Sequence, residues 1–202
     1  MIALASTALA LVLLPQPLAG AVAPVRDTTP ASWQIDASHS DLSFRIRHLM
    51  SRVRGTFKKW EGTITGDTTD WSHASVTVTI QTGSIDTGNE RRDNDLRSDN
   101  FFDAANHPTI TFTSTRVEAH GTELNITGDL TIRGVTRPVV LTGSFLGSTS
   151  SGAGQARVGF EASTRIDRTA FGVTWNRALE GGGALLGDEV QIDLAVEASR
   201  QP

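Results

Sequence analysis

The sequence alternates apolar and polar residues with period two over most of its length from Trp33 onward. Such alternation is typical of antiparallel β-strands that bury one face and expose the other to water. Clusters of Gly, Asp, Asn and Ser interrupt the pattern and predict turns. The alternating stretches lie at residues 42–48, around 57–64, and at 76–80, 110–112, 124–132, 139–145, 158–162 and 190–196. The pattern therefore predicts an all-β fold of about eight strands.

Eight such strands in one domain favour a closed antiparallel barrel, because closure removes exposed strand edges. A sandwich of two sheets with Greek-key connections is the alternative. The chain has no cysteine, which excludes a disulfide scaffold, a thiolate metal site and a thiol nucleophile. Its net charge of -4 argues against nucleic acid as a partner, since nucleic-acid-binding domains usually carry a strong basic excess.

Two stretches do not follow the strand pattern. Residues 89–106 are dense in charges of both signs, carry Leu96, Phe101 and Phe102, and end shortly before Pro108. We expect one or two short helices there, lying across one end of the barrel. Residues 178–187, which follow Trp175, are expected to form a short turn or helix.

The first residues are expected to be a targeting signal. Residues 2–14 form one uncharged apolar run that is too short to span a bilayer, and Ala19-Gly20-Ala21 follows as a small-x-small cleavage pattern. We expect a signal peptide over 1–21, a linker over 22–31 with Pro24 and Pro30, and one domain over 32–200. Such a protein would be periplasmic or secreted. An uncleaved anchor is the alternative, since no Lys or Arg precedes the run.

The interior of the predicted barrel is the candidate binding site. An eight-stranded barrel is either filled by its own side chains or holds one small ligand. The inward-facing set is almost wholly apolar, so any ligand is expected to be lipid-like. The candidate ligand-binding residues are Phe44, Ile46, His48, Phe57, Val78, Ile110, Phe112, Ile126, Leu130, Leu141, Phe160, Trp175 and Ile192.

One third of the basic side chains gather in a single stretch. Between Asp41 and Glu61 the sequence has no acid, and its six positive side chains are Arg45, Arg47, Arg52, Arg54, Lys58 and Lys59. Guanidinium groups bind phosphate well, so an arginine-rich hairpin would suit an anionic head group or an anionic membrane. A solvated outer face is the alternative. The candidate head-group residues are Arg52, Arg54 and Arg168.

Sequence signatures of catalysis are missing. There is no G-x-S-x-G, P-loop or G-x-G-x-x-G motif. The five His are not spaced to share a strand face or a helix face, so we expect no metal site. No catalytic residue is predicted. An enzyme that acts on a small apolar substrate, with His48, Asp167 or Arg168 in the barrel mouth, is the alternative.

Several motifs in order resemble one known family over residues 33–198. Trp33, Ile35, Asp36, His39 and Ser40 open the match, and Arg168 with Phe171-Gly172 lies near its end. The longer motifs are Leu96-Arg97-Ser98 to Phe101-Phe102-Asp103, Gly128 to Thr136, and Gly187-Asp188-Glu189-Val190. The chain is thereby similar to the YceI-like, polyisoprenoid-binding, lipocalin-like proteins. Asp95 and His107 depart from the residues usual in that family.

The resemblance implies an extended antiparallel barrel whose long internal tunnel takes a polyisoprenoid chain. We expect an exported protein that holds an isoprenoid-like lipid, including the tail of an isoprenoid quinone, for transport, storage or sequestration. No cofactor other than this lipid is expected. Transient contact with a membrane surface is expected. A homodimer is one of the oligomeric states compatible with the sequence. The alternative function is an envelope stress or interaction protein with a packed barrel.

Overall fold

The computed structural model describes residues 30–149 and 155–201, and the predicted signal peptide lies outside them. Ala31, the end of the predicted linker, already belongs to the first strand. The strands are β1 (Ala31–Ile35), β2 (Asp41–His48), β3 (Ser51–Phe57), β4 (Trp60–Asp67), β5 (Asp70–Gln81), β6 (Ile85–Asp86), β7 (Thr109–His120), β8 (Glu123–Ile132), β9 (Val135–Thr149), β10 (Arg157–Asp167) and β11 (Leu186–Arg200). The helices are α1 (Glu90–Arg97) and the short 3-10 helices η1 (Thr82–Ser84) and η2 (Arg168–Phe171).

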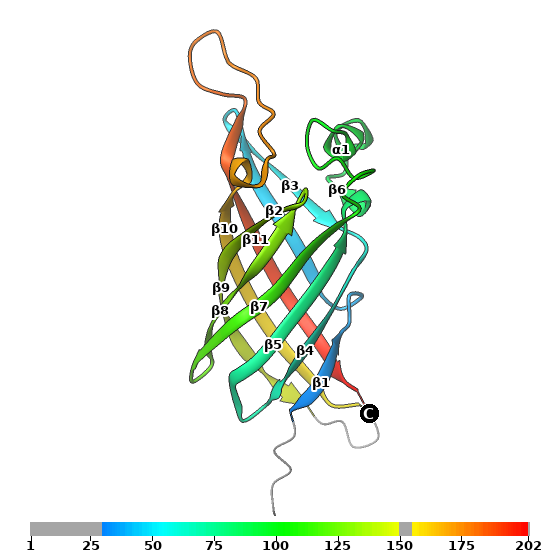
Figure 1. Ribbon diagram of the computed structural model, residues 1–202, viewed down its shortest axis with the longest axis vertical. Helices are drawn as coiled ribbons and strands as arrows, with labels where there is room; N and C mark the ends of the chain where they lie inside the picture. Colours follow the sequence, from blue (N-terminus) through cyan, green and yellow to red (C-terminus); the bar gives the residue numbers. More distant parts are fainter. Residues whose placement is uncertain (1–29, 150–154, 202) are drawn as a thin grey trace, which may run out of the picture.

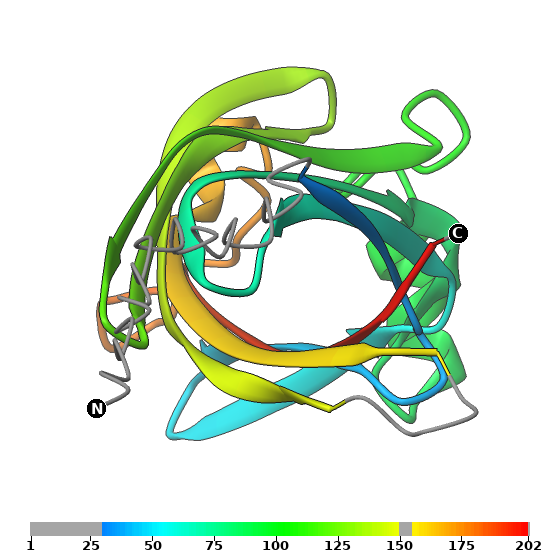
Figure 2. The same cartoon turned by 90° about the horizontal axis from the view of Figure 1, so that it is seen from below.

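The strands form a closed antiparallel barrel. Eight of them make a complete ring in the order β1-β4-β5-β7-β8-β9-β10-β11, and β1 pairs with β11 to close it. Viewed along the barrel, the strands are arranged as a ring (Figure 2). Strand β11 also pairs with β2, β2 pairs with β3, and β3 pairs with β6. These three strands extend the wall of the barrel at the end away from β1 (Figure 1). The predicted eight-stranded barrel is confirmed, and the sandwich is not formed.

The strand expected around residues 57–64 forms with different bounds, as β4, because the chain breaks at Lys58 and Lys59. Phe57 ends β3 and Trp60 begins β4. Both side chains are buried, although they differ by three positions and so cannot lie on one face of a continuous strand. The intervening Lys58 and Lys59 are exposed. This change of parity moves the chain from the wall beside β2 to the wall beside β1.

Helix α1 forms at the end of the barrel where β2, β3 and β6 lie, as predicted (Figure 1). Asn89 caps its first turn by accepting a hydrogen bond from the backbone N–H of Arg92 at 3.0 Å. The buried Asp93 accepts from the N–H and hydroxyl of Thr87 at 2.9 and 2.6 Å. Arg97 donates to the carbonyl of Ile85 at 2.7 Å. These contacts fix α1 beside the mouth of the barrel.

The loop that follows η2 lies at the same end (Figure 1). Ala178 and Ala184 form an isolated bridge inside it, so the segment is a turn and not a helix. Among the described residues, no helix has the length and apolar character needed to cross a membrane.

Aromatic rings fill the opposite end of the barrel. Trp71 packs against Phe160 with ring centres 4.9 Å apart and against Phe145 at 5.4 Å. Trp33 adds a further ring at 6.5 Å from Trp71. Aromatic pairs at these separations stabilise a core beyond the area that they bury. This end is therefore packed, and open space is left toward α1.

Candidate functional site

The barrel encloses a cavity of about 610 Å³. Its wall consists mainly of inward-facing apolar side chains from β2, β3, β5, β7, β8, β9, β10 and β11. The exposed side chains of Arg91 and Asp95 also line it, so the cavity reaches the surface beside α1. The stress-protein alternative requires a barrel filled by its own side chains, and a cavity of this volume contradicts such packing.

Most of the predicted ligand-binding residues line this cavity. They are Phe44, Ile46, His48, Phe57, Val78, Ile110, Phe112, Leu130, Leu141, Trp175 and Ile192. The remaining two, Ile126 and Phe160, line a second cavity of about 80 Å³ on the side of the packed end.

Four side chains separate the two cavities. Val78, Phe112, Leu141 and Leu194 each line both of them. They come from four different strands, so together they form a partition across the barrel. A ligand that enters from the α1 end fills the larger cavity first and meets this partition at its far end.

The polar part of the lining is concentrated at the mouth, and the sequence did not identify most of it. Helix α1 and its cap contribute Asn89, Arg91, Arg92 and Asp95. The guanidinium of Arg92 is held by Thr87, with Nε 2.7 Å from the hydroxyl and Nη2 2.9 Å from the carbonyl. Because the sequence placed this charged segment across one end of the barrel, its charges could have been assigned to the mouth.

At the mouth, the side chains of His48 and Arg91 can form hydrogen bonds with a ligand. Neither the His48 ring nor the Arg91 guanidinium has a hydrogen-bond or ion-pair partner in the part of the chain that the structure describes. Thr164 is a single hydroxyl within the otherwise apolar barrel wall. The arrangement accepts a molecule with a long apolar body and a polar end at the mouth.

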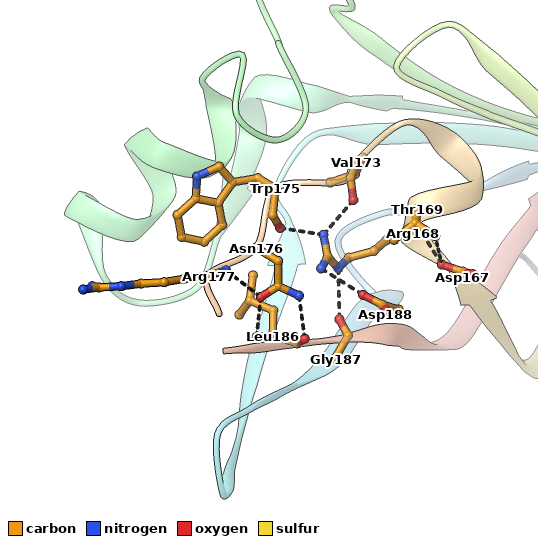
Figure 3. Close-up of polar contacts among 10 residues, drawn as sticks. All are labelled: Asp167, Arg168, Thr169, Val173, Trp175, Asn176, Arg177, Leu186, Gly187 and Asp188. Carbon is orange, nitrogen blue, oxygen red and sulfur yellow. Dashed lines mark hydrogen bonds and ion pairs between the residues drawn. The ribbon is translucent and has the colours of Figure 1, made fainter. Parts of the chain in front are cut away.

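Arg168 holds the loop beside the mouth (Figure 3). Its side chain is only 6% exposed. Its Nη1 donates to the carbonyls of Val173 and Trp175 at 2.6 and 2.9 Å, and its Nε donates to Gly187 at 2.9 Å. Its Nη2 lies 3.1 Å from a carboxylate oxygen of Asp188. The described residues thus engage four of the five guanidinium N–H groups, which leaves at most one for a ligand.

The other two head-group candidates lie elsewhere. Arg52 and Arg54 are exposed on the outer face of β3, whereas Val53 between them lines the cavity. Alternation along the strand imposes this separation. The structure therefore does not bring Arg52, Arg54 and Arg168 together around one head group.

The three residues considered for catalysis do not all face the cavity. Asp167 caps η2, where its carboxylate accepts from the hydroxyl and the N–H of Thr169 at 2.6 and 2.8 Å. These hydrogen bonds lower the pKa of Asp167. His48 and Arg168 line the cavity and Asp167 does not, and the ion-pair partner of Arg168 is Asp188 instead.

One group of potential metal ligands lies away from both cavities. Oxygen or nitrogen atoms of Asp36, His39 and Glu197 all lie within 4.8 Å of one another. Contacts within the protein already engage these atoms: the His39 Nδ1 is 2.7 Å from an Asp36 oxygen, and Glu197 pairs with Arg157. This group fastens the turn after β1 to β11, because the N–H of Asp36 also donates to the carbonyl of Glu197.

A closed antiparallel barrel around an apolar cavity defines a lipocalin-like binding barrel. The comparison with protein families gives the particular family. Residues 33–198 match the YceI-like domain, and the chain belongs to the YceI-like family, as its motifs predicted.

Curated relatives match along nearly all of the barrel. A UPF0312 protein of Staphylococcus epidermidis is 40% identical over 169 residues, which are 83% of this chain and 96% of the relative. Protein YceI of Salmonella arizonae is 40% identical over 174 residues, which are 85% of this chain and 88% of the relative.

Solved structures share the fold. The crystal structure of BcnA from Burkholderia cenocepacia superposes with a TM-score of 0.68 at 27% identity, covering 81% of this chain and 98% of the other. The YceI protein of Campylobacter jejuni gives 0.68 at 32% identity, covering 83% and 96%. A domain from Saccharophagus degradans described as polyisoprenoid binding gives 0.61 at 16% identity, covering 85% and 99%.

Proposed function

We propose that this protein binds a polyisoprenoid-type lipid, including the tail of an isoprenoid quinone, with the tail in the cavity and the polar end at the mouth. The observation that carries the proposal is the division of the 610 Å³ cavity into a long apolar wall and a polar mouth. The similarity to a domain described as polyisoprenoid binding supports it.

Burial alone supplies enough free energy for such binding. Each buried methylene contributes about 0.8 kcal/mol, so the five carbons of an isoprene unit contribute about 3–4 kcal/mol before costs. Ordering a flexible tail offsets much of this gain. The volume lies within the range of about 300–1,000 Å³ that is usual for ligand pockets. Selectivity then depends mainly on how long a tail the cavity accepts.

We propose transport, storage or sequestration of the lipid as the role, with no chemical conversion. A lipid needs a carrier where it must cross water, which fits the predicted export of the chain to the periplasm or the exterior. Export has its own test, the intact mass of the protein recovered from cells. A chain that begins at Val22 supports removal of residues 1–21. A soluble chain that retains Met1 contradicts it.

Ligand identity is tested by extracting the purified protein with organic solvent and identifying the released lipid by mass spectrometry. We expect an isoprenoid lipid. A binding assay with a fluorescent prenyl probe then tests the location. Val139→Trp narrows the cavity that Val139 lines, and we expect it to weaken probe binding by about tenfold or more, since filling the space excludes part of the tail.

Val140→Trp is the matched control, because Val140 is the next residue of β9 and is 48% exposed. We expect unchanged probe binding for this variant. Equal affinities of the two variants would contradict binding inside the barrel.

A further inference from the structure

The hairpin of β2 and β3 contains an arrangement of charges that folding does not favour. The strand register places Arg45 directly opposite Arg54 and Arg47 directly opposite Arg52. Like charges in directly opposed positions destabilise a pair of strands. An aspartate on β11 neutralises Arg45 alone, with Asp193 at 2.7 Å.

Within the described part of the chain, the remaining arginines of this face have no carboxylate partner. Among residues 30–149 and 155–201, the Arg47 guanidinium donates only to the backbone carbonyl of Leu49, at 3.3 Å. Arg52 and Arg54 make no side-chain hydrogen bond or ion pair with any residue that the structure describes. The other acids of β11 beside this hairpin have partners elsewhere, since Asp188 pairs with Arg168 at 3.1 Å and Glu189 with Arg165 at 3.5 Å. The outer face of the hairpin therefore presents uncompensated positive charge.

The tip of the same hairpin is apolar and exposed. Leu49 is 43% exposed and Met50 is fully exposed. Leu49 has φ +52°, in the left-handed region that favours glycine and asparagine over leucine. Leu49 thus sits in an unfavourable backbone conformation without burying its side chain. Folding alone does not account for a leucine at this position.

The tip adjoins the mouth of the cavity. The N–H of Leu49 donates to the carbonyl of Leu185 at 2.9 Å, and Leu185 lines the cavity. The inner face of the hairpin contributes Phe44, Ile46 and Val53 to the cavity wall. A surface that the tip touches would therefore lie next to the opening through which a lipid enters.

We propose that the β2–β3 hairpin docks the barrel mouth onto the surface of an anionic lipid bilayer. Leu49 and Met50 enter the interface, and Arg47, Arg52 and Arg54 contact the anionic head groups. Apolar side chains combined with basic ones are the pairing that holds proteins at such surfaces. The proposal rests on the proposed function, since a lipid carrier must collect its cargo from a membrane.

The test measures co-sedimentation of the purified protein with vesicles of phosphatidylcholine alone or of phosphatidylcholine with phosphatidylglycerol. We expect binding to the anionic vesicles that weakens as salt is raised. The double variant Arg52→Gln, Arg54→Gln is expected to bind them about 30-fold more weakly, the effect of two basic residues near an anionic surface.

Two further variants complete the design. Arg116→Gln, Arg165→Gln removes the same charge from exposed positions on other strands and is expected to retain most of the binding. Leu49→Asn, Met50→Ser removes the apolar tip and is expected to weaken binding without loss of stability, because asparagine suits the backbone at Leu49. All variants carry the same N-terminal segment as the wild-type protein, so any contribution of that segment to vesicle binding is common to them.

Equal binding of the two arginine double variants, or equal binding of the wild-type protein to both vesicle types, would overturn the docking proposal. Uptake of the prenyl probe without vesicles is measured in parallel, since none of the substituted residues lines the cavity. Vesicle binding without probe uptake contradicts the proposed function alone. Probe uptake without vesicle binding contradicts the docking proposal alone.

Discussion

The ring of Phe112 occupies the space that a side chain at Gly128 would need. A Cβ placed on Gly128 would lie 2.4 Å from the Cζ of Phe112 and 2.6 Å from the carbonyl oxygen of Thr113. Phe112 is one of the four residues that separate the two cavities. The absence of a side chain on β8 therefore lets a ring from β7 lie across the barrel interior.

Gly128→Ala is expected to displace this ring. Forcing one extra carbon into a packed contact costs about 1–3 kcal/mol, which urea unfolding measures. Probe binding should change as well, because the partition moves. Gly159→Ala is the control, since a Cβ there would meet nothing closer than Leu146 at 3.6 Å. If both variants unfold at the wild-type urea concentration, the contact between Gly128 and Phe112 does not constrain the barrel.

Phe112→Ala is expected to join the two cavities. The variant should lose about 3–5 kcal/mol of stability, the usual cost of truncating a buried phenylalanine. Its ratio of affinities for long over short prenyl alcohols should rise, because longer tails gain space beyond the partition. Fluorescence competition measures this ratio. Leu130→Ala provides the comparison, since Leu130 lines only the larger cavity. The same ratio in both variants would show that Phe112 does not limit tail length.

The inward-facing residues of the cavity wall could be predicted from the sequence, because side chains alternate between the two faces of each strand. Phe44 and Ile46 share one face of β2, and alternation requires no knowledge of neighbouring strands. The break between Phe57 and Trp60 was missed, although the change of parity between them is visible in the sequence. A change of parity between apolar residues marks a point where the chain must leave its strand or form a bulge.

The polar mouth could not be predicted residue by residue. Arg91 and Arg92 are neighbours on α1, and Arg92 is bound to Thr87 whereas Arg91 has no hydrogen-bond or ion-pair partner among the described residues. That difference depends on how the helix rests on the barrel, which local pattern does not specify. Arg168 was assigned to a head group on its residue type alone. Its burial among backbone carbonyls arises from a loop whose path only the folded structure defines.

Arg168→Met is expected to release the loop over residues 173–187. Removing the guanidinium leaves the carbonyls of Val173, Trp175 and Gly187 without their donors, and an unsatisfied buried polar group costs about 1–3 kcal/mol. We expect a loss of about 3 kcal/mol or more in stability, together with faster amide hydrogen exchange in the loop.

Asp188→Asn tests whether the ion pair of Arg168 or its hydrogen bonds to backbone carbonyls contribute more to stability. The Asp188 side chain is 62% exposed, and exposed ion pairs contribute about 0–1 kcal/mol. We therefore expect a small change in stability and unaltered exchange in the loop. A loss as large as that of Arg168→Met would mean that the charge of Arg168 matters more than its hydrogen bonds.

Asp36 makes the stability of the closure between β1 and β11 depend on pH. Hydrogen bonds from the Ser38 hydroxyl and from the His39 ring hold the pKa of Asp36 well below its ordinary value. The unfolded chain then takes up this proton at a higher pH than the folded chain does. The contribution is therefore complete above the unfolded pKa, and it is lost as pH falls through the folded pKa.

We expect the free energy of unfolding of the wild-type protein to fall steeply below about pH 4, near the ordinary pKa of an aspartate. Asp36→Asn should be less stable near neutral pH and should show a shallower decline in acid, since its side chain does not titrate. Ser38→Ala should lie between the two, because it removes the largest contribution to the pKa shift. Urea unfolding measured across this pH range gives the three curves. Parallel curves for Asp36→Asn and the wild-type protein would show that Asp36 contributes nothing to acid unfolding.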